Sequence, residues 1–276
     1  MKRAVQVVAT LVVGILLFGG CSDSGSTTDG GKVDATATTV GAEKTLQILV
    51  TNDDGVSADG IDAVVEGLRM VPNVKVTVVA PATNQSGKGG SVTGGTLVAT
   101  DATTKSGYPA KAVAGTPADT IIWAIDQKGI DFVPDLVVSG INAGANMGPA
   151  VDLSGTVGAA RAAVTRSIPA IAASQGPLVA PFDFPAGVKQ VLAWLASNRP
   201  AIADGSITHA TVFNLNIPTC PTGSVRSQIS VPVAPTADGY TTAPDCMSTA
   251  TNPVDDIKAY LEGYAPLSAV SATPAS

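Results

Sequence analysis

Two adjacent carboxylates, Asp53 and Asp54, stand directly after a short apolar run at residues 46–51. Adjacent carboxylates repel each other, and a bound divalent cation relieves that repulsion. Oxygen ligands of this kind suit Mg²⁺, Mn²⁺ or Ca²⁺. A solvated turn is the alternative, because the side chain of Asn52 can bond its own backbone and Gly55 tolerates a positive φ. Taken alone, these residues fit either a metal site or an ordinary turn.

A second group of residues offers amides, hydroxyls and backbone that a ligand can approach closely. Asn142 and Asn146 lie among several glycines, which let backbone N–H groups come near a ligand. A helix is then expected to start at Ser154, Gly155 and Thr156. The N-terminus of a helix that carries hydroxyls and bare amides binds phosphate readily. Small residues at a tight contact between helix and sheet would give the same pattern, so two interpretations stay open.

The chain has a single histidine, His209. Histidine phosphatases, binuclear zinc phosphatases, zinc proteases and Ser-His-Asp hydrolases all need one or more imidazoles in a defined setting. His209 precedes an expected strand and lies outside any such motif. We therefore expect it at the surface or at a strand edge, and the classes that need a catalytic imidazole are disfavoured.

Cys220 and Arg226 have the Cys-x5-Arg spacing of cysteine phosphatases. That chemistry needs an activated thiolate at a helix N-terminus, whereas residues 228–235 are rich in β-branched residues and interrupted by two prolines. If Cys21 carries a lipid, Cys220 and Cys246 remain as a pair, for which a disulfide is expected in an oxidising compartment. A cysteine phosphatase that uses Cys220 and Arg226 is kept as an alternative.

The N-terminus has the layout of an exported lipoprotein. Lys2 and Arg3 precede an uncharged apolar stretch, which ends in two glycines and Cys21. Small residues before a cleavage point are typical of signal peptides, and the cysteine directly after them resembles that of bacterial lipoproteins. We expect a signal peptide at residues 1–21, acylation of Cys21 and attachment to the cell envelope through this lipid. A plain secretory signal or a transmembrane anchor is the alternative, and the stretch is short for an anchor.

The remaining chain divides into a tether and one domain. Residues 22–44 are rich in Ser, Thr, Gly and Asp and lack hydrophobic periodicity, so they predict a flexible tether. Residues 45–276 are enough for one α/β domain, with a C-terminal extension from about residue 205. The formal net charge of −6 disfavours a nucleic-acid polymer as partner. Small anionic substrates stay compatible, because a metal ion can invert the local field.

Alternating strands and helices must position these groups. Apolar or β-branched runs predict strands, and apolar residues at helical spacing predict helices. The predicted strands are 46–51, 74–80, 135–139, 168–173 and 211–217. The predicted helices are 58–70, a helix that opens at 115–119, 155–166, 186 to about 197, and one near 253–261. This alternation implies a Rossmann-like α/β fold, a mostly parallel sheet with helices on both faces. Ligands in such sheets bind beyond the carboxyl ends of strands, where the polar clusters after Thr51, Ala80 and Val138 fall.

Several motifs occur in the order in which one enzyme family has them. They are Ile48-Leu49-Val50-Thr51-Asn52-Asp53-Asp54-Gly55, Val78-Val79-Ala80-Pro81, Asn84-Gln85-Ser86-Gly87, Gly115-Thr116-Pro117, Pro134-Asp135-Leu136-Val137-Val138-Ser139-Gly140-Ile141-Asn142, Ser154-Gly155-Thr156-Val157, and Asp256 with Gly263-Tyr264 and Pro266-Leu267. On these motifs the chain resembles the SurE survival-protein nucleotidases. The resemblance spans about residues 46–270.

The resemblance implies a Rossmann-like enzyme that hydrolyses nucleoside monophosphates, or other small phosphomonoesters, with one divalent cation. Its metal ligands fall on Asp53, Asp54, Ser86 and Asn142, of which the two aspartates would also be the catalytic residues. Its phosphate contacts fall on Asn146, Ser154, Gly155 and Thr156. Assembly as a homo-oligomer is left open.

The sequence departs from the family pattern beside Ser86. The family usually has a basic residue where Gln85 stands, and a histidine in the following loop where Lys88-Gly89-Gly90 stands. These departures concern substrate preference and rate rather than the metal ligands. A nucleotide-binding lipoprotein without catalytic activity is the alternative from another functional class, and it would bind nucleotide without releasing phosphate.

Overall fold

Nine strands of the described residues pair into one sheet in the order β3-β4-β2-β1-β5-β6-β7-β9-β8. The structure is a computed structural model that describes residues 43–178 and 180–274. The strands are β1 (Leu46–Thr51), β2 (Val74–Pro81), β3 (Ala99–Thr103), β4 (Pro109–Val113), β5 (Leu136–Ala143), β6 (Ala170–Gln175), β7 (Thr211–Ile217), β8 (Gln228–Ser230) and β9 (Ala265–Ser271). The strands from β4 to β7 in this order are parallel, whereas β3 pairs antiparallel with β4 and β9 antiparallel with β7.

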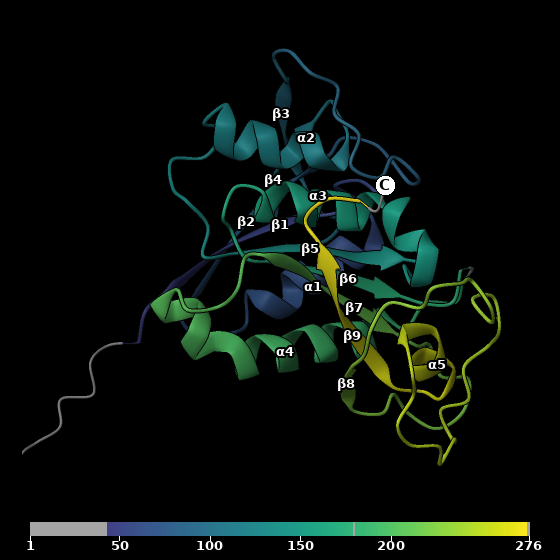
Figure 1. Ribbon diagram of the computed structural model, residues 1–276. Coiled ribbons are helices and arrows are strands. Elements are labelled where there is room, and N and C mark those ends of the chain that lie inside the picture. Colours follow the sequence, from purple (N-terminus) through teal and green to yellow (C-terminus); the bar gives the residue numbers. More distant parts are fainter. Residues whose placement is uncertain (1–42, 179, 275–276) are drawn as a thin grey trace, which may run out of the picture. The chain divides into compact units, whose positions relative to one another are not determined.

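Helices cover both faces of the sheet. They are α1 (Asp59–Leu68), α2 (Pro117–Ile121), which continues as the π-helix η1 (Ile122–Asp126), the 3-10 helix η2 (Gly148–Asp152), α3 (Gly155–Val164), α4 (Phe184–Asp204) and α5 (Asp256–Leu261). Figure 1 shows α2 and α3 on one face and α1 and α4 on the other. The predicted mostly parallel α/β fold with helices on both faces is confirmed.

The central strands are apolar because both of their faces are buried, as in other parallel sheets. In β1, Ile48 and Val50 pack toward α1 and α4, whereas Leu49 packs toward α2 and α3. A third, smaller core joins Met147 to Tyr260 of α5. The C-terminal part of the chain is therefore packed against the loop that follows β5.

The structure differs from the predicted elements in several places, among them the short strand β8, which was not predicted. The hairpin β3–β4 was not predicted, because most side chains of its edge strand β3 are exposed or half-buried polar residues. Helix α4 continues past the predicted end near residue 197 to Asp204, with Pro200 inside it. Strand β9 was also not predicted and pairs with β7. Residues after 205 thus extend the same sheet.

Some predictions fall on residues that the structure does not describe. The signal peptide at 1–21, the acylated Cys21 and the tether up to residue 42 lie outside the described residues. Within the described ranges, none of the helices has the length and apolar composition that crossing a membrane requires.

Cys220 and Cys246 form a disulfide, with their Cα atoms 5.7 Å apart. The bridge joins two irregular stretches in the region between β7 and α5. A bridged Cys220 has no thiolate to offer. The guanidinium of Arg226 is also occupied, because it stacks on the ring of Tyr264 and donates to the carbonyl oxygens of Ala250 and Glu262. The cysteine-phosphatase alternative is therefore wrong for this pair.

Candidate active site

The topology places the polar clusters in one crevice. The chain leaves β1 toward β2 on one side, and β5 is the neighbour of β1 on the other side. Ligands in open α/β sheets bind where the strand order reverses in this way, beyond the carboxyl ends of the strands. Asp53 and Asp54 follow β1, and Asn142 stands near the end of β5. Figure 1 shows these strand ends side by side.

Asp53 is enclosed by the start of α3. The residue is only 3% exposed, and its Oδ1 accepts a hydrogen bond from the hydroxyl of Thr156 at 2.7 Å. Gly155 explains how the helix comes so close, because a Cβ there would lie 2.8 Å from the Cβ of Asp53. The glycine in the first turn of α3 is thus required by the position of this carboxylate.

Asp54 points toward β5 and the loop after β2. Its Oδ2 accepts from the backbone N–H of Ala143 at 3.0 Å, and its Oδ1 accepts from the amide of Asn84 at 3.4 Å. Asp54 is half-buried. The carboxylate therefore ties the end of β5 to the segment that carries Ser86.

The turn considered as an alternative is present, but it is not solvated. Asn52 donates to the carbonyl of Gly55 at 2.9 Å and accepts from its N–H at 3.2 Å, and Gly55 has a φ of 103°. Asn52 and Asp53 are both buried. The turn thus serves to bring a carboxylate into the interior.

The charges of the two aspartates make this site costly without a cation. Burial, followed by the charge of Asp54, raises the pKa of Asp53 from 3.8 to about 6. Burial also raises the pKa of Asp54. A cation between two such carboxylates would relieve both effects, since an opposite charge favours the ionised form.

Ser86 reaches the same crevice from the loop after β2. The N–H of Gln85 donates to the carbonyl of Asp53 at 2.7 Å, and the N–H of Ser86 donates to the side chain of Asn84 at 2.9 Å. The following residues pack on α3, where a Cβ at Gly158 would lie 2.0 Å from the carbonyl oxygen of Gly89. Ser86 itself is exposed, which leaves its hydroxyl accessible to a ligand.

Asn142 presents an oxygen to the crevice. The side chain is 8% exposed, and its amide nitrogen donates to the carbonyl of Gly144 at 2.6 Å. Because the nitrogen is used in this way, the carbonyl oxygen is the side-chain atom left for a cation. Asn142 also stands in register with Ser174 of β6.

These side chains meet around a cavity of about 220 Å³. Five of the predicted site residues line it: Asp53, Ser86, Asn142, Asn146 and Ser154. The other lining residues are Gly87, Ala143, Gly144, Ala145, Ala150, Leu153, Leu178 and Tyr240. Of the remaining predicted residues, Gly155 and Thr156 lie behind Asp53 in the first turn of α3, and Asp54 lies beside Ala143. The structure thus brings all eight into one region.

The donor set fits a hard divalent cation. Across the described ranges, no three His, Cys, Asp or Glu side chains gather into a cluster that could hold a metal ion. A cation here would depend on two carboxylates, a hydroxyl and an amide oxygen. Oxygen-only sets of this kind suit Mg²⁺, Mn²⁺ or Ca²⁺ rather than zinc.

The N-terminus of α3, beside Asp53, also lines the cavity. Ser154 is the N-cap of this helix, and its hydroxyl accepts from the N–H of Val157 at 3.1 Å. The first N–H groups of a helix lack partners within it and favour anions. Carboxylates next to a helix N-terminus suit a ligand that carries both a cation and an anionic group.

Sequence reasoning missed the residues that hold Asn146. Asn214 and Asn216 of β7 bind its peptide groups, and Ser174 of β6 binds its side chain. Tyr240 lines the cavity and donates to the carbonyl of Ala145. The available signal was the presence of two asparagines within a mostly apolar strand.

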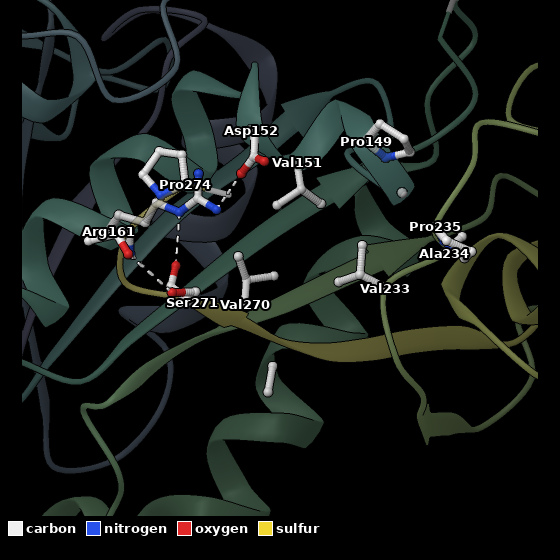
Figure 2. A pocket seen from close by; sticks show the side chains of 13 residues that line it. Pro149, Val151, Asp152, Arg161, Val233, Ala234, Pro235, Val270, Ser271 and Pro274 are labelled. Atoms are coloured by element: carbon white, nitrogen blue, oxygen red, sulfur yellow. Dashed lines mark hydrogen bonds and ion pairs between the residues drawn. The ribbon is translucent and has the colours of Figure 1, made fainter. Parts of the chain in front are cut away.

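A larger cavity of about 440 Å³ lies near the end of β9 and has a different character. Its buried cation, Arg161, donates to Asp152 at 2.6 Å and to the carbonyl of Ser271 at 2.9 Å (Figure 2). The other labelled side chains are mostly valine and proline. Arg161 thus links α3 to the end of β9, and its charge is already paired with Asp152 rather than available to an anionic ligand.

The single histidine, His209, is exposed and lies just before β7.

Known proteins share this fold and these motifs. A profile of the family described as "Survival protein SurE" matches residues 48–237. A 5'-nucleotidase SurE from Methanopyrus kandleri is 41% identical over 182 residues, covering 63% of this chain and 66% of the relative. One from Pelobacter propionicus is 39% identical over 181 residues, covering 66% and 69%. The chain thus spans about two thirds of the length of these relatives.

The crystal structure of a SurE protein from Aquifex aeolicus resembles most of this fold. It superposes with a TM-score of 0.64 at 25% identity, and the match covers 83% of this chain and 95% of that one. The sequence match and the structural match therefore point to the same family.

Proposed function

The chain belongs to the SurE family, and on that premise we propose that it is a divalent-metal-dependent nucleotidase, which hydrolyses nucleoside monophosphates to nucleosides and phosphate. The observation that carries the proposal is the cavity in which a buried carboxylate, a hydroxyl and two amides meet the N-terminus of a helix. The name 5'-nucleotidase of the relatives supports the 5'-phosphate as the group released. Acid phosphatase activity on other small phosphomonoesters belongs to the same proposal.

The oxygens of Asp53, Asp54, Ser86 and Asn142 would hold the cation. A bound cation would polarise a phosphoryl oxygen and would lower the pKa of a water molecule bound to it. The hydroxyl of Thr156 keeps the carboxylate of Asp53 in one orientation. Binding of the cation requires both carboxylates to be ionised, and their raised pKa values mean that protons compete with the metal at acidic pH.

The amide of Asn146 and the first turn of α3, at Ser154, Gly155 and Thr156, would bind the phosphoryl group. Helix N-termini stabilise negative charge through free N–H groups and the helix dipole. No lysine or arginine is among the described residues that line the cavity. The helix end is therefore the main fixed source of positive potential that the chain offers to developing charge on the phosphoryl oxygens.

The rim of the cavity would receive the nucleoside. Leu153 and Leu178 are both exposed, although they are large and apolar, and Tyr240 stands with them around the opening. An apolar rim around a polar floor suits a ligand that has an aromatic base at one end and a phosphate at the other.

We also propose that the protein is exported and attached to the cell envelope through an acylated Cys21. The sequence at the N-terminus supports this, and so does the disulfide between Cys220 and Cys246, since structural disulfides are typical of oxidising compartments. Metabolic labelling with a fatty-acid probe should tag the wild type but not Cys21→Ala. Labelling that is equal in both would refute the anchor.

The test of the enzymatic proposal is phosphate release from a panel of nucleoside 5'- and 3'-monophosphates, with and without EDTA. We expect release that EDTA abolishes and that Mn²⁺ or Mg²⁺ restores. Asp53→Asn should be inactive, whereas Asp131→Asn, at an exposed aspartate before β5, is the matched control and should be active.

Two outcomes would contradict this proposal. Tight nucleotide binding without phosphate release under any metal condition would identify the non-catalytic binding protein instead. Release that EDTA leaves unchanged would remove the role of the two aspartates as metal ligands.

A further inference from the structure

The loop that carries Asn146 is held by an unusual set of buried side chains. The N–H of Asn146 donates to Oδ1 of Asn216 at 2.7 Å, and its carbonyl accepts from Nδ2 of the same residue at 3.0 Å. Nδ2 of Asn214 donates to the same carbonyl at 2.9 Å. One residue of the loop thus has both of its peptide groups bound by side chains of β7.

The side chain of Asn146 is fixed as well. Its Nδ2 donates to the hydroxyl of Ser174 at 2.8 Å, and the register of β6 and β7 places Ser174 beside Asn216. Ser174, Asn214 and Asn216 are fully buried, while Asn146 is 8% exposed and lines the cavity. An amide nitrogen carries two hydrogens. The hydrogen that Ser174 does not accept is therefore left for a ligand.

Stability alone does not account for Asn214. Its Oδ1 is buried and has no hydrogen-bond partner among the described residues, and a buried unpaired carbonyl destabilises a fold. The carbonyl of Asn146 would still be bound by Asn216 if Asn214 were apolar. Leucine has a similar volume and suits a strand buried on both faces. An asparagine at this position therefore points to a role beyond folding.

We propose that Asn214 and Asn216 are positioning residues, which hold Asn146 where its amide meets the phosphoryl group of the substrate. The inference rests on the proposed function, because it assigns a role to the same cavity. The two asparagines do not line the cavity, so they act through Asn146. We call Ser174, Asn214 and Asn216 the amide clamp.

The first variant is Asn214→Leu, which removes one bond of the amide clamp together with the unpaired oxygen. It should melt at or above the temperature of the wild type. Its kcat/KM for the preferred nucleoside monophosphate should fall by roughly tenfold, and its inhibition constant for inorganic phosphate should rise by roughly tenfold. This is the effect expected when one hydrogen bond to a charged group is impaired. The affinity for Mn²⁺ should not change, because Asp53 and Ser86 are held by other elements.

The second variant is Asn216→Leu, which removes both bonds to the peptide groups of Asn146 and should have the larger effect. Thr104→Val is the matched control, because the buried hydroxyl of Thr104 binds Asp62 at the opposite edge of the sheet. The control should lower the melting temperature without changing the inhibition constant for phosphate. If Asn216→Leu does not fold, Asn214→Leu still decides the question.

A double-mutant cycle tests whether the amide clamp acts through Asn146. Asn146→Ala combined with Asn214→Leu should be no worse than Asn146→Ala alone, because the first change removes the group that the second one positions. Wild-type kcat/KM and phosphate inhibition in Asn214→Leu, or additive losses in the double variant, would overturn the inference.

Failure of the proposed function has a different signature. A wild type that releases no phosphate from any nucleotide would contradict the nucleotidase proposal. Calorimetric titration with inorganic phosphate would then still test the amide clamp. Equal phosphate affinity in the wild type and Asn214→Leu, or no phosphate binding by either, would overturn it.

Discussion

Asp53→Asn gives the most quantitative test of the site. In the metal-free protein, burial and the charge of Asp54 raise the pKa of Asp53 from 3.8 to about 6. A difference of about two pKa units between the folded and unfolded states corresponds to at most about 3 kcal/mol in the free energy of unfolding. The amide has nearly the same shape, and its oxygen can still accept from Thr156. The substitution therefore removes the charge without removing packing.

The direction of the effect follows from proton binding. The unfolded chain loses the Asp53 proton near pH 3.8, whereas the folded protein keeps it until about pH 6. Between these values the folded state holds more protons, so the free energy of unfolding falls as the pH rises. The contribution of this group is fully present below pH 3.8 and is lost above pH 6. Asn at this position does not titrate.

The expected difference thus appears only at neutral pH. With EDTA, Asp53→Asn and the wild type should be about equally stable at pH 4. At pH 7.5 the variant should be more stable by up to about 3 kcal/mol, a rise in melting temperature of roughly 6–12 °C for a domain of this size. Thermal denaturation at the two pH values measures this, with Asp131→Asn as the control that should show no such gap.

Addition of Mn²⁺ should reverse the order at pH 7.5, because a ligand that binds only the folded wild type stabilises it selectively. Phosphatase turnover of Asp53→Asn should be lower by several orders of magnitude. An equal gap at pH 4 and pH 7.5 would show that the effect is packing and not charge. No gap at either pH, with a normal response to Mn²⁺, would refute a buried carboxylate that binds metal.

Three further substitutions test the surroundings of the site. Gly155→Ala should abolish turnover while the protein stays folded, because its Cβ would lie 2.8 Å from the Cβ of Asp53; activity assays and circular dichroism check this. Gly158→Ala should weaken Mn²⁺ binding in a calorimetric titration, because its Cβ would displace Gly89 and with it the preceding loop. Cys220→Ser should lower the free energy of unfolding by about 3 kcal/mol, for a loop with a sequence separation of 26, with normal turnover at 25 °C; an unchanged midpoint in urea would contradict the role of the disulfide.

The sequence predicts best the elements whose side chains are nearly all buried, because burial selects apolar residues along the whole element. β1 and β7 have the predicted bounds. β1 is mostly apolar, as expected for a parallel strand that is covered on both faces. β3 lacks this signal, since as an edge strand it has only partial burial. Pro200 normally predicts the end of a helix, but α4 continues because Ile202 packs into the core of the sheet.

The site is predictable as far as its residues form local motifs at strand ends. Asp53 follows a strand and Ser154 opens a helix, and polar groups that gather at this edge of a parallel sheet are typical of a ligand site. The amide clamp is different. Asn146 and Asn216 are 70 residues apart, and β6 lies between β7 and β5, the strand that precedes the loop of Asn146. Which polar side chain meets which loop depends on the strand order and register, and neither can be read from a short segment.

Asn214 and Asn216 nevertheless leave a signal that can be used. They occur two residues apart in β7, so their side chains lie on the same face of a strand that is paired on both sides. Polar groups at such positions are shielded from water, and burying them without any partner is costly, so side chains of this kind are expected to bind another part of the protein. In this sheet the part they bind is the loop after β5, at the edge where substrates are expected. Buried polar residues on one face of a central strand therefore predict the support of a site, even where they do not identify its ligand.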